Sequence, residues 1–120
     1  MGGRESIFSL REALAGADDD SDLFKAMAEA FVTEGPKDLA EAQRALAARD
    51  GAALARSAHR LKGALLQFCA PMVLASAKEL EALGTGGTFD AAAPVFVRLE
   101  QQLGQLFMAL RETLVKGPDA

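Results

Sequence analysis

His59 is the only histidine among the 120 residues, and the side chains around it suit an anion. A helical pattern runs from about residue 50 to residue 69, so that Lys62 follows His59 by one turn. Gly63 comes next, although a glycine inside a helix costs about 1 kcal/mol relative to alanine. A glycine at this position keeps the approach to the imidazole clear. An accessible imidazole beside an ammonium group is suited to accepting a transient phosphoryl group.

The helix that carries His59 has one apolar stripe. On a helical wheel of about 100° per residue, the stripe covers an arc of roughly 80°. Its members are Leu54, Ala58, Leu61, Leu65 and Phe68. His59 lies roughly 120–130° from the centre of the stripe, which predicts that the imidazole faces solvent or the edge of a groove. Taken by itself, a lone exposed histidine is also compatible with a surface residue that has no role.

The hexapeptide Ala58-His59-Arg60-Leu61-Lys62-Gly63 resembles the signature of the histidine-containing phosphotransfer (HPt) domain family. The resemblance extends downstream through residues at the family's spacing, namely Ala70, Val73, Ala77, Leu80 and Glu81, and covers roughly residues 23–114. The chain departs from the family pattern at Leu66, where small residues are frequent, and at Cys69, where glycine is frequent. These departures concern packing and the docking surface and leave the acceptor histidine in place.

The resemblance implies that His59 is the phosphoacceptor and that Lys62 stabilises the phosphoryl group. The resemblance also implies that a polar residue on the next helix lies near the histidine, and Glu81 stands at that position. Glu81 is therefore expected either to contact the imidazole, directly or through water, or to be a simple surface carboxylate. The implied partners are response-regulator receiver domains and a hybrid sensor histidine kinase. The receiver is expected to bring the metal ion, so that no cofactor is assigned to this chain.

A docking surface for the partner is predicted around His59. It comprises Ala55, Arg56, Leu66, Gln67 and Glu81 together with Lys62 and Gly63. Leu66 is also compatible with partial burial in the core, because a single exposed apolar residue does not mark a contact surface. Cys69 is interpreted as a small buried hydrophobe, since this is the usual place of a free cysteine.

Composition limits the other classes of function that the chain can have. Half of the residues are apolar, a quarter are charged and the formal net charge is −4, so nucleic-acid binding is not indicated. The single cysteine fits a reducing cytoplasm, and no apolar run approaches the length that a membrane span requires. The N-terminus lacks the features of a signal peptide. We expect a cytoplasmic monomer formed by one domain over residues 1–120, with its core at about 20–116 and with residues 1–4 and 117–120 disordered.

Helical periodicity dominates every long segment, which predicts an all-α fold. We expect an antiparallel up-and-down four-helix bundle with one or two additional short N-terminal helices, because the connections are short. Asp20 or Ser21 is predicted to cap a helix that Gly35-Pro36 then interrupts. The next helices are expected at residues 36–48, 50–69 and 71–83, followed by a loop at 84–87 and a last helix from a cap at Asp90 to residue 116. A short helix is expected at residues 5–15.

Two other functions remain open at this point. The chain is also compatible with an interaction module that docks a receiver or kinase without carrying phosphate. An enzyme that uses His59 as a general base is a weaker alternative, because no second histidine and no nucleophile partner is visible. No phosphate loop or kinase signature is present, so the chain is not expected to use ATP. The run Asp18-Asp19-Asp20 is interpreted as a linker and helix cap instead of a cation site, because it lacks the EF-hand spacing.

Overall fold

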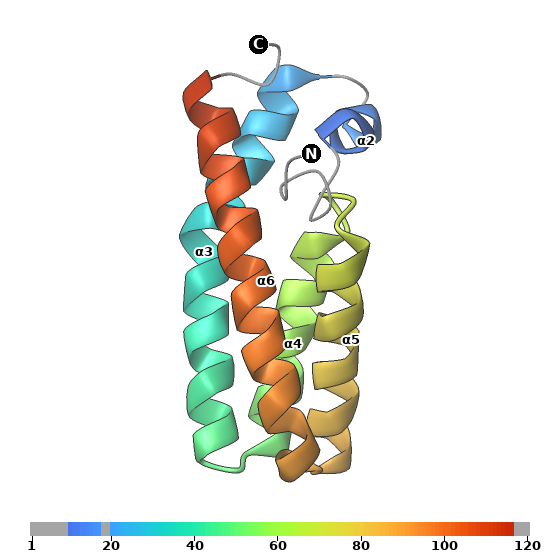
Figure 1. The fold of residues 1–120 in the computed structure, drawn as a ribbon, viewed down its shortest axis with the longest axis vertical. Helices are drawn as coiled ribbons and strands as arrows, with labels where there is room; N and C mark the ends of the chain where they lie inside the picture. The colour runs from blue at the N-terminus through green and yellow to red at the C-terminus, as the bar shows by residue number, and fades with distance from the viewer. Residues whose placement is uncertain (1–9, 18–19, 117–120) are drawn as a thin grey trace.

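The computed structural model describes residues 10–17 and 20–116, and this part of the chain contains helices and no strand. The helices are α2 (Leu10–Gly16), α3 (Ser21–Ala47), α4 (Gly51–Leu65), α5 (Pro71–Gly86) and α6 (Phe89–Lys116). The four long helices α3 to α6 form an antiparallel up-and-down bundle, and α2 packs against α3 at one end (Figure 1). The predicted fold class is therefore confirmed.

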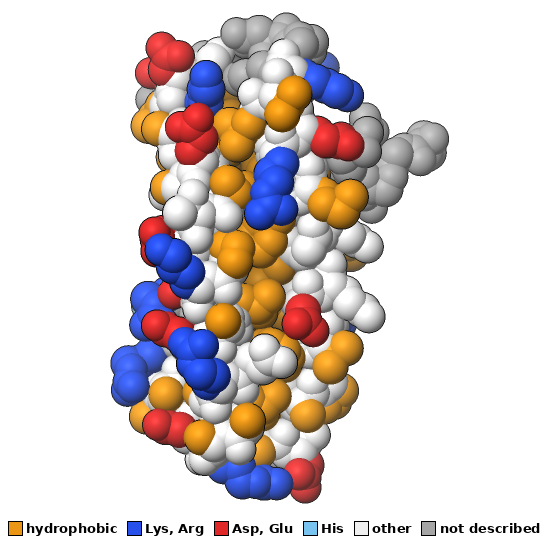
Figure 2. All heavy atoms as spheres, turned by 90° about the vertical axis from the view of Figure 1, so that its left-hand side faces the viewer, with side chains coloured by type: hydrophobic (Ala, Val, Ile, Leu, Met, Phe, Trp, Pro, Cys, Tyr) orange, Lys and Arg blue, Asp and Glu red, His pale blue; other side chains and the backbone are white. Residues whose placement is uncertain are grey.

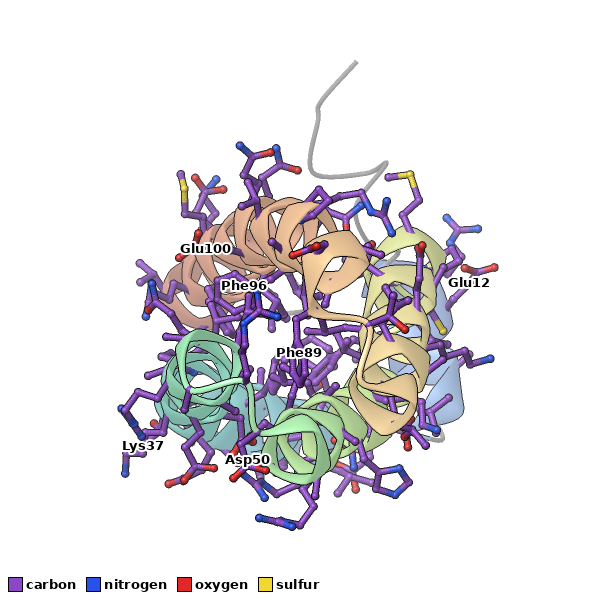
Figure 3. The ribbon with its side chains drawn as sticks, turned by 90° about the horizontal axis from the view of Figure 1, so that it is seen from below. Glu12, Lys37, Asp50, Phe89, Phe96 and Glu100 are labelled. Atoms are coloured by element: carbon purple, nitrogen blue, oxygen red, sulfur yellow. The ribbon has the colours of Figure 1, made fainter. Side chains whose placement is uncertain are left out.

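Seen along its axis, the bundle is a ring in which each long helix packs on its neighbours in sequence and α6 closes against α3 (Figure 3). Phe89 and Phe96 point into the space that the helices enclose, whereas Lys37 and Glu100 point outward. The apolar stripe predicted for α4 is buried, with exposed fractions of 0–1%. At the end where α2 lies, the ring of Phe31 contacts the rings of Phe68 and Phe107 at centroid distances of 5.4 and 5.2 Å.

Side-chain caps begin two of the long helices. The carboxylate of Asp20 accepts from the backbone N–H of Leu23, and that of Asp50 accepts from the N–H of Ala53. Each satisfies one of the donors that a helix N-terminus leaves unpaired. The Asp50 cap fixes where α4 begins and hence how many turns separate its start from His59.

The interruption predicted at Gly35-Pro36 is wrong, because α3 continues through both residues as one helix. Proline removes one backbone hydrogen bond from a helix interior, and the packing around Gly35 offsets this loss. A Cβ placed on Gly35 would lie 2.8 Å from the ring of Phe107 and 3.1 Å from the ring of Phe31. The close approach of α6 at Gly35 thus holds the two halves of α3 in line.

Other helix ends also differ from the prediction. The helix α4 ends at Leu65 and not near residue 69, and Cys69 adopts a positive φ of 49° in the turn that follows. Cys69 is only partly buried there, so the prediction of a buried cysteine is wrong. The helix α5 continues to Gly86, so the predicted loop shrinks to the residues around Gly87, which has a φ of 68°. Asp90 does not cap α6, because α6 begins at Phe89 and Asp90 lies in its first turn.

One long face of the bundle, formed by α3 and α6, carries a band of hydrophobic side chains with charged groups along its margin (Figure 2). The lone histidine is not visible on this face. The chemically distinctive part of α4 is therefore presented elsewhere on the bundle.

Some of the predictions lie outside the described residues. These are the disorder of residues 1–4 and 117–120, the start of the helix at residues 5–15, and the role of Asp18 and Asp19. Within residues 10–17 and 20–116, no helix is long and apolar enough to cross a membrane.

Candidate functional site

His59 lies near the middle of α4 on the side away from its buried stripe. The side chain is 65% exposed, as the helical wheel predicted. Its sequence neighbour Ala58 is fully buried, so the backbone beneath the imidazole is anchored in the core. The site therefore consists of an accessible ring on a rigid support.

Glu81 on α5 contacts the imidazole directly. Its Oε2 lies 3.0 Å from Nδ1 of His59, across the interface between α4 and α5. Because an ionised carboxylate can only accept a hydrogen bond, Nδ1 carries a proton and donates the hydrogen bond to Glu81. In the neutral ring this tautomer leaves the lone pair on Nε2, the nitrogen that Glu81 does not contact. Of the two interpretations left open for Glu81, the structure shows the direct contact with the histidine.

Lys62 pairs with the same carboxylate. Its Nζ lies 2.7 Å from Oε1 of Glu81, and both side chains are about one quarter exposed. Each oxygen of Glu81 thus has its own donor, one from each of two successive turns of α4. The hydrogen bond from Lys62 lowers the pKa of Glu81, and the hydrogen bond from His59 adds to this effect. The carboxylate therefore stays ionised and remains an acceptor for the imidazole.

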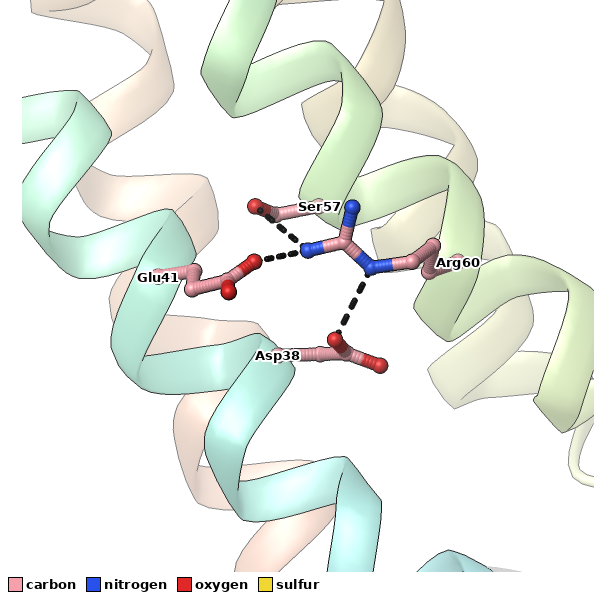
Figure 4. A network of polar contacts seen from close by, with 4 residues as sticks. All are labelled: Asp38, Glu41, Ser57 and Arg60. Atoms are coloured by element: carbon pink, nitrogen blue, oxygen red, sulfur yellow. Dashed lines mark hydrogen bonds and ion pairs between the residues drawn. The ribbon is translucent and has the colours of Figure 1, made fainter.

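Arg60 fixes the other side of α4. Its guanidinium binds Asp38 and Glu41 on α3 and also contacts Ser57, as Figure 4 shows. The hydrogen bond to Asp38 raises the pKa of Arg60. The positive charge next to His59 in sequence is thus engaged in joining α4 to α3 and does not face the imidazole. Sequence reasoning missed this bridge, because Arg60 gave no sign of which helix it would meet.

Gly63 has open space beside it. A Cβ built on Gly63 meets nothing within 4 Å, apart from its chain neighbours and its own helix backbone. Packing within the described residues therefore does not require a glycine here. That Gly63 keeps the approach to His59 clear stays a prediction.

The residues predicted for the docking surface divide into two groups. Arg56, Leu66 and Gln67 are exposed, with Leu66 at 64%, so the alternative of partial core burial does not hold for Leu66. Ala55 is half-buried, because its backbone lies against α5 at Gly84. Ala55 thus belongs more to the contact between helices than to an open surface.

Two grooves lie between α3 and α4, and neither was predicted from the sequence. One lies between α3 and the end of α4 and has a volume of about 350 Å³. Most of its lining is apolar, and the lining residues are Ala26, Met27, Ala30, Phe31, Glu34, Gly35, Asp38, Ala64 and Gln67. The other, of about 410 Å³, lies nearer the start of α4 and includes Arg44 and Arg56 in its lining. In the described part of the chain neither of these two arginines forms an ion pair. No sequence signal marks these grooves, because each depends on how α3 packs against α4.

The described residues contain no group of three or more His, Cys, Asp or Glu side chains that could hold a metal ion. The groups that meet at the site are the imidazole of His59, the carboxylate of Glu81 and the ammonium group of Lys62. An imidazole with its Nδ1 proton held and its Nε2 free can act as a nucleophile toward an electrophilic phosphorus.

The pKa shift of Glu81 predicts a pH-dependent contribution to stability. A carboxylate whose folded-state pKa is lowered stabilises the fold above its ordinary pKa of 4.5 and loses that contribution as the pH falls through the lowered value. At neutral pH the parent should therefore be more stable than Glu81→Gln by about 1 kcal/mol. The two should converge in acid. Urea unfolding of both proteins across this range measures the difference.

Lys62→Ala provides the control for this experiment. In the Lys62→Ala background, Glu81→Gln should change the pH dependence of stability much less. The hydrogen bond from Lys62, the larger cause of the lowered pKa of Glu81, has been removed there. An unchanged difference between parent and Glu81→Gln at neutral and acid pH would show that the ion pair contributes nothing to the fold.

Comparisons with known proteins place this geometry in a family. The sequence profile of the Hpt domain matches residues 26–109, more than two thirds of the 120 residues. Two solved structures share the fold at 21% sequence identity, and each match covers 92% of this chain and 96% of the chain that it is compared with. One is the HPT domain of an Hpt sensor hybrid histidine kinase from Shewanella, with a TM-score of 0.84. The other is histidine-containing phosphotransfer protein B from Pseudomonas aeruginosa, with a TM-score of 0.83. A comparison with curated proteins finds no match.

Proposed function

Because the chain belongs to the Hpt domain family, whose members carry phosphoryl groups in two-component signalling, we propose that it is a relay intermediate and that His59 is its phosphoacceptor. In this proposal His59 takes the phosphoryl group from an aspartate of one receiver domain and passes it to an aspartate of another. The observation that carries the proposal is the hydrogen bond of 3.0 Å between His59 Nδ1 and Glu81. This contact leaves Nε2 as the nucleophile on a side chain that is 65% exposed.

The transfer step follows from this arrangement. Nε2 attacks the phosphorus of the receiver's acyl phosphate, the bond between phosphorus and the aspartate oxygen breaks, and the aspartate leaves as a carboxylate. No proton needs to move, because Nδ1 keeps its proton throughout. The ring becomes positively charged as the bond between nitrogen and phosphorus forms, and the carboxylate of Glu81 stabilises that charge at Nδ1. The reverse transfer to a second receiver uses the same contacts.

Lys62 has two parts in the proposed step. Its ion pair with Glu81 holds that carboxylate in place against the imidazole. Its ammonium group also offsets the negative charge of an arriving phosphoryl group. Phosphoryl transfer needs chiefly alignment and charge neutralisation. In the proposal the receiver supplies the metal ion, and this chain supplies the nucleophile and the docking surface.

The proposed partners are receiver domains and a hybrid sensor histidine kinase, which a monomer would meet in the cytoplasm. The exposed Leu66, seven residues after His59, supports docking next to the imidazole, whereas the groove that includes Gln67 lies on the α3 side of α4. The second groove is lined by Arg44, Arg56 and Arg60 and also by the carboxylates of Glu41 and Asp50. Arg44 and Arg56, which form no ion pair in the described part of the chain, support steering of an acidic receiver surface.

The proposed function is tested with a purified phosphorylated receiver. Incubation should move the label to this chain, and a second receiver added later should take the label away. An adduct on histidine is destroyed by acid, whereas an ester on serine or threonine survives. If receivers bind without moving the label, the chain is an interaction module and not a relay.

Docking kinetics separate the two kinds of surface residue. Arg56→Ala should slow association with a cognate receiver by up to about tenfold at low salt and by less at high salt, because steering is screened by ions. Leu66→Ala should instead shorten the lifetime of the complex, with little dependence on salt. Stopped-flow measurements at two ionic strengths distinguish these results.

Lys116→Ala is the matched control, since it removes the same charge from the end of α6, which lies across the bundle from α4. It should change association less than Arg56→Ala does. If Lys116→Ala and Arg56→Ala slow association equally, only the total charge of the chain matters. If Leu66→Ala leaves the lifetime of the complex unchanged, the docking surface lies elsewhere.

A further inference from the structure

Two glycines bring α4 and α5 into direct backbone contact. A Cβ placed on Gly51 would lie 2.4 Å from the carbonyl oxygen of Gly84. A Cβ placed on Gly84 would lie 2.9 Å from the backbone nitrogen of Ala55 and 3.2 Å from the carbonyl oxygen of Gly51. The nearest atoms are backbone atoms, which cannot rotate away as the end of a side chain can. Any larger residue at Gly84 therefore has to separate the two helices or rotate one of them.

The same two helices form the contact between His59 and Glu81 on the adjacent turns. Glu81 precedes Gly84 by three residues, which is about 4.5 Å along α5, and His59 follows Ala55 by four residues, about 6 Å along α4. Because the helices are antiparallel, the pair Gly84–Ala55 and the pair Glu81–His59 are successive contacts along one interface. The spacing at the glycines thus sets how far the carboxylate lies from the imidazole.

We propose that Gly84, together with Gly51, is a positioning residue for the phosphoacceptor site. The close backbone contact sets the register and spacing of α4 and α5 so that Glu81 reaches both Nδ1 of His59 and Nζ of Lys62. The effect of Gly84 on the rate of phosphoryl transfer rests on the function proposed above. Its effect on the orientation and tautomer of the imidazole does not. Gly84 itself touches neither His59 nor the phosphoryl group.

Gly84→Ala tests the proposal. The added methyl group requires a shift of several tenths of an ångström at this turn, and a hydrogen bond is lost when its donor and acceptor separate beyond about 3.5 Å. The His59 imidazole should then lose its preference for the tautomer with the proton on Nδ1. Nitrogen-15 NMR of the ring reports the tautomer without ambiguity, because the chain has one histidine. Transfer from a phosphorylated receiver should slow by up to about 100-fold, the effect of misplacing a reacting group by about 1 Å.

Gly104→Ala is the matched control. It also adds a methyl group to a glycine within a helix, but a Cβ there meets nothing within 4 Å. Its ring spectrum and transfer rate should equal those of the parent. The role of Glu81 is isolated by a double-mutant cycle, in which Gly84→Ala should add little to the effect of Glu81→Gln. Independent, multiplying effects of the two substitutions on transfer would contradict the proposal.

Gly51→Ala keeps the proposal testable if Gly84→Ala does not fold. Gly51 is the first residue of α4, where the turn can unwind without opening the core, so the same change of tautomer is expected in a milder form. If either folded variant melts at a lower temperature but keeps the parent's ring spectrum, the glycines serve packing alone and the inference is wrong. If even the parent takes up no phosphoryl group, the proposed function fails, and the ring spectra still decide the positioning role.

Discussion

The His59→Gln variant should take up no phosphoryl group from a phosphorylated receiver, while the parent becomes labelled. The chain has one histidine, so no second imidazole can substitute for it. Glutamine lacks a nucleophilic ring nitrogen but has a similar size and polarity. The label is followed on a phosphate-affinity gel or by radioactivity. Its loss in acid together with its survival in base identifies the bond between phosphorus and nitrogen, because an acyl phosphate is lost in both.

This loss should be one of chemistry and not of folding. The side chain of His59 is 65% exposed and contributes nothing to the core, so the thermal melt of the variant should stay close to that of the parent. Leu66→Ala, which also alters the exposed side of α4, should still become labelled. Undiminished labelling of His59→Gln, or an adduct that survives acid, would assign the acceptor to another residue.

Replacing Gly63 should separate stability from transfer. Gly63→Ala is expected to stabilise the fold by up to about 1 kcal/mol, because alanine favours the helix and a Cβ there meets no other group. Gly63→Gln adds a long side chain one turn after His59 and should slow transfer by about 100-fold, the effect expected when the reacting atoms are held about 1 Å too far apart. Thermal melts and single-turnover transfer rates of both variants measure the two effects.

Gly104→Gln is the control for the steric effect. Gly104 also stands within a helix with open space beside its Cα, but it belongs to α6 and not to the site. Its substitution should raise stability without changing transfer. Rapid transfer by Gly63→Gln would show that the glycine has another purpose than access to the imidazole.

The local features of the fold were predictable because they depend on residues close in sequence. Apolar residues at helical spacing identified the buried stripe of α4 and the solvent-exposed position of His59. The cap at Asp50 was equally accessible, since a carboxylate before a helical pattern binds the free N–H groups of the first turn. Four long helical segments with short connections then leave few arrangements other than a bundle.

The prediction at Pro36 was wrong because local preference yielded to packing. A proline after a glycine is a strong signal for a helix boundary. Here Gly35 gives the ring of Phe107 room to approach α3, and that contact comes from a residue more than 70 positions away in the sequence. The same limit applies at Gly84, which resembles part of a loop in the sequence but packs within a helix against Gly51.

The partners within the site were predictable only in part. The downstream spacing of Glu81 indicated a residue near the imidazole, and the structure shows the contact. The pairing of Lys62 with the same carboxylate was not predicted, because the sequence does not tell which turn of α4 faces α5. The bridge from Arg60 to Asp38 depends in the same way on the rotation of one helix against another.

The exposure of His59 has a consequence for signalling over time. A phosphoryl group on a ring that is 65% exposed stands in water, so the protein does not shelter it by burial. In the proposed relay the phosphoryl group is therefore lost at a rate set by hydrolysis unless a receiver takes it first. With one histidine per chain, the largest signal that can be stored equals the number of copies present. The output of such a relay would thus be tuned through expression level and encounter frequency.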